Sequence, residues 1–331
     1  MTRNRIWIAV AAVVALAGLS YVWFFSSADP AATPQRQGTA GPENPGPGGL
    51  VDHPVFPATA TADAVGRGDA GIPEFDINAL TNYQDLLDQI GVQRDWTQWA
   101  RERGLVVLLE ADMWPVYVAM DDAELRSLAE AGDLLAEFAI TQKLMIEQPL
   151  EAYDRIRLLV LEGSVEAMDM MQHQIKVMQQ GLEMPGASYG WSDQLVAEVN
   201  QFIEQSDLDL RTERMAWLLL TEVYMGQPRG STLAQDPDLG IAPGVLPIEY
   251  RAACARAQQL RDSLLETWVE NGLEEPPIEA PPIGFVGLSQ NPDLLAACPA
   301  SELPLADLSG CRTILMRYEG TVWDDYVCAT P

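Results

Sequence analysis

Two segments of this chain, residues 130–140 and 161–171, share one pattern of small and apolar residues. Gly132 is followed four residues later by Ala136, and Gly163, 31 residues further along, is followed in the same way by Ala167. Large apolar residues continue both series at four-residue steps, which is the spacing of one helix face. We expect each glycine to form the corner of a helix hairpin and each alanine to let two helices approach closely. The pattern therefore predicts antiparallel helix pairs.

Helix start and stop signals extend this interpretation along the chain. Asp95, Ser192 and either Asp121 or Asp122 are good N-cap residues, and Gly91 ends an apolar helical run. Short connections between such runs are typical of antiparallel neighbours. We predict a mainly α fold, an α-solenoid-like stack of antiparallel helix hairpins, over residues 72–273.

Residues 104–120 fit this pattern less well. Their Val and Leu residues lack a helical period, and Pro115 interrupts the segment. A short strand or an extended crossing is the alternative to a helix here.

A third, weaker copy of the repeated pattern contains Ala216 and Tyr224, with Thr212 in the place of the glycine. The step from the second copy is 49 residues, which requires an insertion of about 18 residues between them. Where the third copy has Tyr224, the first two copies have Leu144 and Ile175.

These positions resemble a known family of repeats. Ala152 lies eleven residues before Gly163, and Ala216 and Tyr224 end near a glycine, as in Sel1-like repeats, the shorter-looped relatives of tetratricopeptide repeats. The resemblance covers about residues 129–226. It implies an α-solenoid fragment that binds other proteins on its surface, and it transfers no catalytic residue.

The amino terminus contains an uncharged, mostly apolar run, residues 6–25, that follows Arg3 and Arg5. A helix of this length spans about 30 Å, the hydrocarbon thickness of a bilayer. The positive-inside rule leaves the short amino terminus in the cytoplasm and the body in the periplasm. We predict that residues 1–28 are an uncleaved single-pass anchor in the inner (cytoplasmic) membrane. A cleaved signal peptide, which would release a periplasmic or secreted body, is the alternative.

Composition changes after the anchor. Residues 29–71 are rich in Pro, Gly, Ala and Thr, which predicts a disordered linker. Residues 1–71 carry four basic and five acidic residues, whereas residues 72–331 carry 16 and 43. A body this acidic repels phosphate backbones, which argues against nucleic-acid binding.

All the cysteines lie in the last quarter of the chain: Cys254, Cys298, Cys311 and Cys328. Their spacing contains no Cys-x-x-Cys, which disfavours thioredoxin-like chemistry and zinc knuckles. In an oxidising compartment they predict two disulfides, in any of three pairings. The Pro-rich residues 274–287 cannot form a helix. We therefore expect residues 274–331 to be an irregular segment that disulfides pin to the helical domain.

Residues that could carry chemistry are few. The body has one histidine, His173, in a Gln-rich stretch that we expect to be a turn facing solvent. Four methionines could bind Cu(I) with it: Met168, Met170, Met171 and Met178. All but Met170 follow, together with Ile175, a heptad that is typical of helix packing. We predict no catalytic residue, no cofactor and no metal site.

These observations favour a scaffold, anchored by residues 6–25, that binds an unknown protein partner in the cell envelope. The alternative is a cell-envelope hydrolase that uses acidic residues on cell-wall sugar or peptide. A shallow groove lined by Tyr, Trp and Leu would favour the scaffold. A deep pocket that holds a carboxylate with a raised pKa would favour the hydrolase.

Overall fold

The computed structural model describes residues 74–76, 83–184, 186, 189–231, 247–284, 292–318 and 321–329. The predicted anchor (1–28) and linker (29–71) lie outside the described residues. Among the helices of the described ranges, none is both long enough and apolar enough to cross a bilayer.

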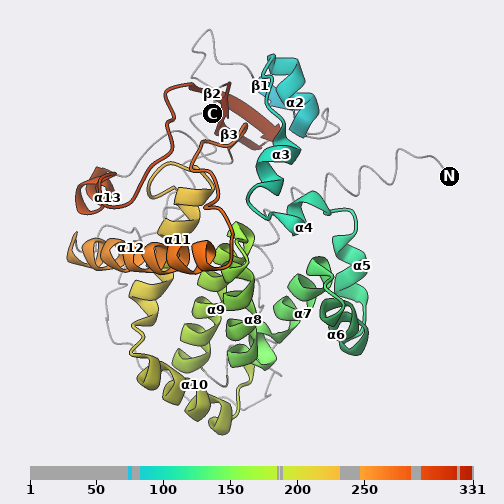
Figure 1. Cartoon of the computed structure of the whole chain (residues 1–331), viewed down its shortest axis with the longest axis vertical. Coiled ribbons are helices and arrows are strands. Elements are labelled where there is room, and N and C mark those ends of the chain that lie inside the picture. The colour runs from blue at the N-terminus through green and yellow to red at the C-terminus, as the bar shows by residue number, and fades with distance from the viewer. Residues whose placement is uncertain are drawn as a thin grey trace, which may run out of the picture.

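Most of the described chain is helical, and a small sheet lies at one end (Figure 1). The helices are α2 (Tyr83–Ile90), α3 (Trp96–Arg101), α4 (Val106–Leu109), α5 (Trp114–Ala119), α6 (Asp122–Glu130), α7 (Leu134–Glu147), α8 (Pro149–Leu161), α9 (Val165–Glu183), α10 (Asp193–Ser206), α11 (Leu210–Tyr224), α12 (Pro247–Glu270) and α13 (Pro292–Ala297). The strands are β1 (Glu74–Asp76), β2 (Cys311–Tyr318) and β3 (Thr321–Cys328).

The predicted N-caps Asp95 and Ser192 are confirmed, and of the two candidates Asp121 and Asp122 the cap is Asp121. The carboxylate of Asp95 accepts the N–H of Gln98 at 3.0 Å, and that of Asp121 accepts the N–H of Glu124 at 2.8 Å. Ser192 caps α10 through its side-chain oxygen. Each cap satisfies a backbone donor that the first turn of a helix leaves without an intrahelical partner.

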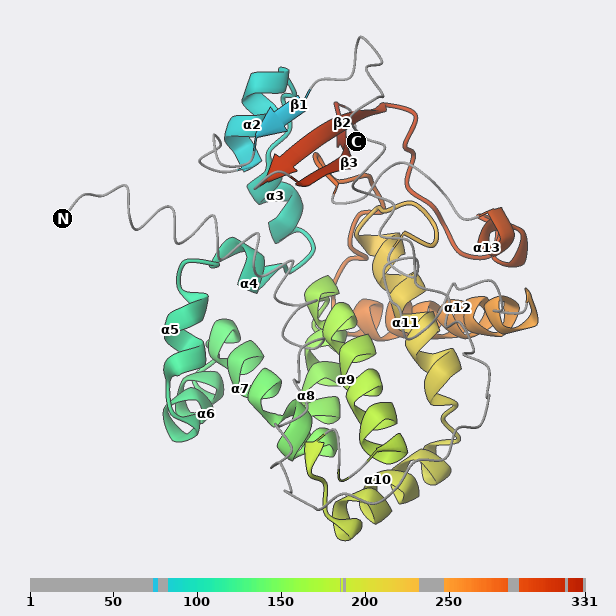
Figure 2. The same cartoon turned by 180° about the vertical axis from the view of Figure 1, so that it is seen from behind.

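Gly132 and Gly163 form the corners between α6 and α7 and between α8 and α9. Their φ angles are 90° and 92°, a backbone conformation that glycine adopts without steric cost. The next residue, Asp133 or Ser164, caps the helix that follows. The alanine four residues after each corner is fully buried. The helices therefore pack in pairs, and α7, α8 and α9 lie side by side (Figure 2).

The third copy of the pattern has a different register from the one that the sequence suggests. Asp209 caps α11, and its carboxylate accepts the N–H of Thr212. Thr212 therefore takes the place of Ala136 and Ala167, and not that of a glycine. The left-handed residue at this corner is Asp207, with a φ of 50°. The sequence comparison placed the third copy one helical turn too late.

The centre of the core lies between α9 and α11, which pack against each other. The heptad positions that were predicted to pack are buried: Met168, Met171, Ile175 and Met178. The expectation for His173 is wrong, because this residue lies within α9 and not in a turn. Its ring is half-buried, and its Nδ1 lies 2.9 Å from the carbonyl oxygen of Asp169.

The carboxyl-terminal segment forms a sheet. Strands β2 and β3 pair antiparallel from Cys311↔Cys328 to Tyr318↔Thr321, and β1 lies parallel to β2. The expectation of an irregular segment is therefore wrong for residues 311–318 and 321–328. Because β1 precedes α2, the sheet joins the two parts of the chain that the sequence analysis separated.

Two disulfides hold this region together. Cys254–Cys298 connects α12 to the end of α13, and Cys311–Cys328 closes the β2–β3 hairpin. The described residues contain no free cysteine. Structural disulfides persist in oxidising compartments, so these two indicate an extracytoplasmic location.

Candidate functional site

An open groove with a volume of about 720 Å³ lies where α6, α7 and α8 meet. It is lined by Ala129, Gly132, Asp133, Leu134, Glu137, Leu150, Glu151, Asp154, Arg155, Leu158, Leu159 and Glu162. Both views place α6 and α7 on the side of the molecule opposite to α13 (Figures 1 and 2). The groove is therefore separate from the disulfide that joins α12 to the end of α13.

The corner between α6 and α7 forms one wall of this groove. After the turn at Gly132, the carboxylate of Asp133 accepts the N–H of Ala136 at 3.1 Å and the O–H of Tyr117 at 2.7 Å. The second hydrogen bond is the main reason that the pKa of Tyr117 is raised. It also ties α5 to the corner. Leu134, the first residue of α7, is 45% exposed beside it.

A second hollow of about 470 Å³ joins the groove at this corner. It is lined by Val106, Glu110, Met113, Tyr117, Gly132, Asp133, Leu134 and Leu135. Residues 132–134 line both hollows, so the surface is continuous from α4 and α5 to α8. We call the two hollows together the α5–α8 groove.

Along α8, apolar and acidic lining residues alternate at four-residue steps. The four residues of this α8 stripe are Leu150, Asp154, Leu158 and Glu162. Four residues advance a helix by about 6 Å, so the α8 stripe is about 18 Å long. Leu158 is the most exposed of the large apolar residues in the groove, at 61%. Asp154 and Glu162 make no ion pair with any described residue.

The charged lining residues beside the α8 stripe form ion pairs. Arg155 contacts Glu137 at 2.8 Å through Nη1 and Glu151 at 3.0 Å through Nε. Arg126 also contacts Glu151, at 2.7 Å, and this hydrogen bond is the main reason that the pKa of Glu151 is lowered. The lining of the 720 Å³ hollow has five carboxylates and one guanidinium in all. The groove is therefore negatively charged even after these pairs are counted.

Large apolar side chains are exposed around the groove more than elsewhere on the described surface. Nine large apolar residues are exposed on the described surface, and five of them lie on the helices around the groove or directly before α5. The five are Met113, Val116, Val118, Leu134 and Leu158. Single exposed apolar residues are normal on a protein surface, but a cluster beside a groove marks an interaction site.

Two carboxylates with strongly raised pKa values lie outside the groove. Burial raises the pKa of both Glu166 and Asp325 to about 8. Glu166 accepts the N–H of Val107 at 2.9 Å at the start of α4, and Asp325 accepts the N–H of Tyr326 within β3. In the ranges that the structure describes, no three His, Cys, Asp or Glu residues are grouped so that they could hold a metal ion. The groove is thus suited to binding by apolar contact and charge.

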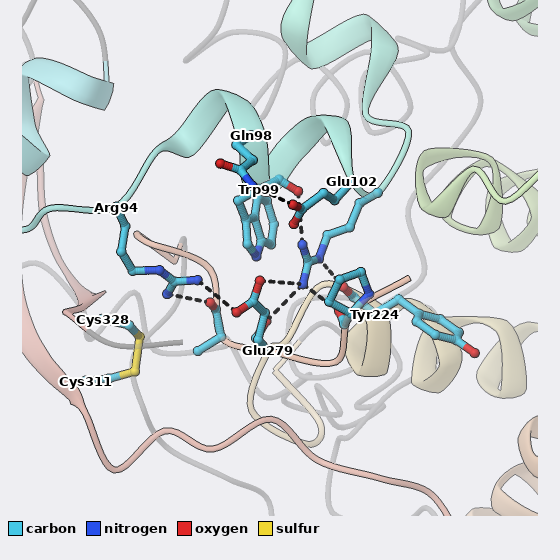
Figure 3. A network of polar contacts seen from close by, with 11 residues as sticks. Arg94, Gln98, Trp99, Glu102, Tyr224, Glu279, Cys311 and Cys328 are labelled. Carbon is cyan, nitrogen blue, oxygen red and sulfur yellow. Dashed lines mark hydrogen bonds and ion pairs between the residues drawn. A yellow bond between two sulfur atoms is a disulfide. The ribbon is translucent and has the colours of Figure 1, made fainter. Parts of the chain in front are cut away.

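A dense polar network near the sheet fixes the Pro-rich segment (Figure 3). Glu279 lies between the guanidinium groups of Arg94 and Arg103, at 3.4 and 3.8 Å. Both arginines also donate to backbone carbonyls within residues 277–280. These contacts attach the segment to the residues on either side of α3, so we assign the network a structural role.

The residues that the sequence singled out are mostly in the interior. Gly132 lines the groove and Gly163 forms the second corner, whereas the remaining repeat positions are buried: Ala136, Ala167, Ala216 and Tyr224. Leu158 was not among the residues that the sequence singled out. A signal was present, because residues 158–161 are all apolar and consecutive positions on a helix cannot all face one core.

The chain was compared with protein-family models, with curated protein sequences and with solved structures. None of these comparisons found a match. The fold and the α5–α8 groove are therefore the basis for assigning a function.

Proposed function

We propose that this protein is a membrane-anchored, extracytoplasmic helical scaffold that holds a protein partner in the α5–α8 groove. In this proposal residues 6–25 anchor the chain in the inner membrane, and residues 29–71 are a linker to a periplasmic body. The proposed kinship with Sel1-like repeats agrees with this role, because that family binds proteins on helical surfaces. The observation that carries the proposal is the exposed α8 stripe around Leu158.

The shape of the groove supports a macromolecular ligand. Sites for small molecules enclose most of their ligand. The α5–α8 groove is instead open, and exposed apolar residues of α5 and α7 continue beside it. A segment of another protein can cover such a surface, and burial of its leucines would contribute about 25 cal/mol for each Å² removed from water.

The disulfides support the proposed location, because they indicate an oxidising compartment. A tether between a bilayer and this body would let a scaffold reach partners near the membrane surface.

The hydrolase alternative needs a carboxylate with a raised pKa that faces a substrate site. Among the described residues, the carboxylates whose pKa is raised to about 8 are Glu166 and Asp325, and neither lines the groove. The geometry therefore supports the scaffold better.

Site-specific photocrosslinking in cells tests the proposal. Benzoylphenylalanine replaces Leu158 in the full-length, anchored protein, and a matched variant carries it at Ile248, which is 71% exposed on α12 and lines neither hollow. We expect a discrete protein adduct at position 158, little at position 248, and a lower yield at 158 when Leu134 is changed to Asp. Equal adducts at both positions, or none at 158, would contradict the proposal.

A further inference from the structure

We infer that the partner enters the α5–α8 groove as a cationic amphipathic helix, in which basic and apolar residues alternate along one face. This inference rests on the proposed function and specifies the chemistry of the partner.

The charge of the groove is complementary to a cationic partner. The five carboxylates of the main hollow face one guanidinium, that of Arg155, which Glu137 and Glu151 already bind. Asp154 and Glu162 remain without an ion pair among the described residues. Lys or Arg side chains of a partner would neutralise them, whereas an acidic partner would be repelled.

The spacing of the α8 stripe matches the spacing of side chains on one face of a helix. Leu158 lies one helical turn from Asp154 and one turn from Glu162, so an apolar group and a charge follow each other about every 6 Å. A partner helix presents side chains on one face at the same interval, at positions i and i+4. A partner helix whose face alternates basic and apolar residues can therefore place a basic side chain at each acid of the α8 stripe and an apolar side chain at each leucine.

The lining of the groove favours a helix over an extended peptide. An extended peptide must find partners for its backbone N–H and C=O groups. The side chains that line the main hollow supply a single donor group, that of Arg155, and most of its lining residues lie within helices, whose backbone groups bond inside the helix. At the corner, the N–H groups of Gly132 and Asp133 donate to carbonyls of α6. A helical ligand satisfies its own backbone and needs only side-chain contacts, as in helix-in-groove recognition.

The probes for a test are three synthetic peptides of about 18 residues, long enough to span about 27 Å as a helix. The first has Lys and Leu alternating at three- or four-residue steps, with Ala and Gln elsewhere. The second has the same composition in shuffled order, and the third has Glu in place of Lys. Binding to the full chain in zwitterionic nanodiscs is followed by fluorescence anisotropy, with empty nanodiscs as background.

The first peptide should bind at least tenfold more tightly than the other two. Asp154→Asn with Glu162→Gln should weaken it about three- to tenfold and reduce its salt dependence, as expected for two exposed ion pairs. The matched charge control is Asp262→Asn with Glu266→Gln, which changes two exposed acids of α12 that line neither hollow. The control pair should leave binding within about twofold.

Apolar contact is tested separately. Leu158→Ser should weaken the first peptide about tenfold, while Ile248→Ser leaves it unchanged. All these positions are exposed, so each variant should keep the far-ultraviolet circular dichroism spectrum of the parent.

Two results would overturn the inference: equal binding of the shuffled peptide, or equal weakening by the α12 pair. Either would mean that the acidic surface attracts any polycation. If photocrosslinking at position 158 succeeds and the first peptide does not bind, the groove holds a partner of other chemistry, and the proposed function stands without this inference. If crosslinking at 158 fails, the proposed function itself fails.

Discussion

Arg103 shows how much of the molecule can depend on one side chain. Its side chain has no exposed surface, and it donates to the carbonyls of Tyr224 at 2.7 Å, Trp99 at 3.0 Å and Pro277 at 2.5 Å. The guanidinium also lies 4.4 Å from the centroid of the Trp99 ring. Burial lowers the pKa of Arg103 to about 10, so the group stays charged at neutral pH. One residue thus ties α3, the end of α11 and the Pro-rich segment together.

Replacement of Arg103 by Met should therefore lower the free energy of unfolding by about 3–5 kcal/mol, because buried carbonyls lose their donor. Arg101→Met is the matched control, since Arg101 is exposed at the end of α3, two residues before Arg103, and it should cost less than about 0.5 kcal/mol. Urea denaturation of the two variants measures the difference. Equal losses would contradict this assignment.

Asp325 makes stability depend on pH. It is 2% exposed, and burial raises its pKa to about 8, against about 3.9 in an unfolded chain. Between these values the unfolded chain releases a proton that the folded protein retains, so stability falls as pH rises from about 4 to about 8. Asp325→Asn removes this contribution. The variant should gain stability relative to the parent across this range in urea titrations, and parallel curves for the two proteins would refute the expectation.

At the level of elements, the two disulfides stabilise by closing loops of different length. Their sequence separations are 44 residues for Cys254–Cys298 and 17 for Cys311–Cys328. When both cysteines of a pair are changed to Ser, the chain-entropy model predicts that the free energy of unfolding falls by about 4 kcal/mol for the first pair and about 3 kcal/mol for the second. Guanidinium denaturation of the two double variants tests this order. A larger loss from the hairpin pair would show that packing, and not loop closure, dominates.

Elements that depend on neighbouring residues were predictable, and those that depend on distant ones were not. Asp95 and Asp121 act on donors three residues away, so the sequence indicated these helix starts correctly. The start of α4 is instead bonded by Glu166, which lies 59 residues from Val107. Nothing within residues 104–120 carries that information, so a strand remained an alternative.

The β2–β3 hairpin is a different case, because its signal was local and was overlooked. The segments CRTILMRY and TVWDDYVC are rich in β-branched and aromatic residues, and Glu319 and Gly320 separate them. Two such runs around a two-residue connection predict a hairpin. The parallel pairing with β1 had no such signal, because it joins residues about 240 positions apart.

At the scale of the whole molecule, the acidic character and the presence of two disulfides could be predicted from composition. Which cysteines pair, and where the groove lies, could be learned only from the fold. The corner at Gly132 could be predicted from its repeat. The packing of α5, α7 and α8 brings Tyr117 to this corner and leaves Leu158 exposed. Neither result can be predicted from the repeat. The sequence therefore predicted helix pairs and a protein-binding role without the surface to which we now assign that role.

The most direct test of this account compares crosslinking in cells between two double variants, one with its changes in the α5–α8 groove and one with its changes on α12. Benzoylphenylalanine at position 134 reports on the groove corner from outside the α8 stripe. We predict a discrete adduct that falls at least severalfold with Asp154→Asn and Glu162→Gln and persists with Asp262→Asn and Glu266→Gln. An adduct of the same yield in both double variants, or no adduct in the unchanged protein, would contradict the assignment of the α5–α8 groove as the binding surface.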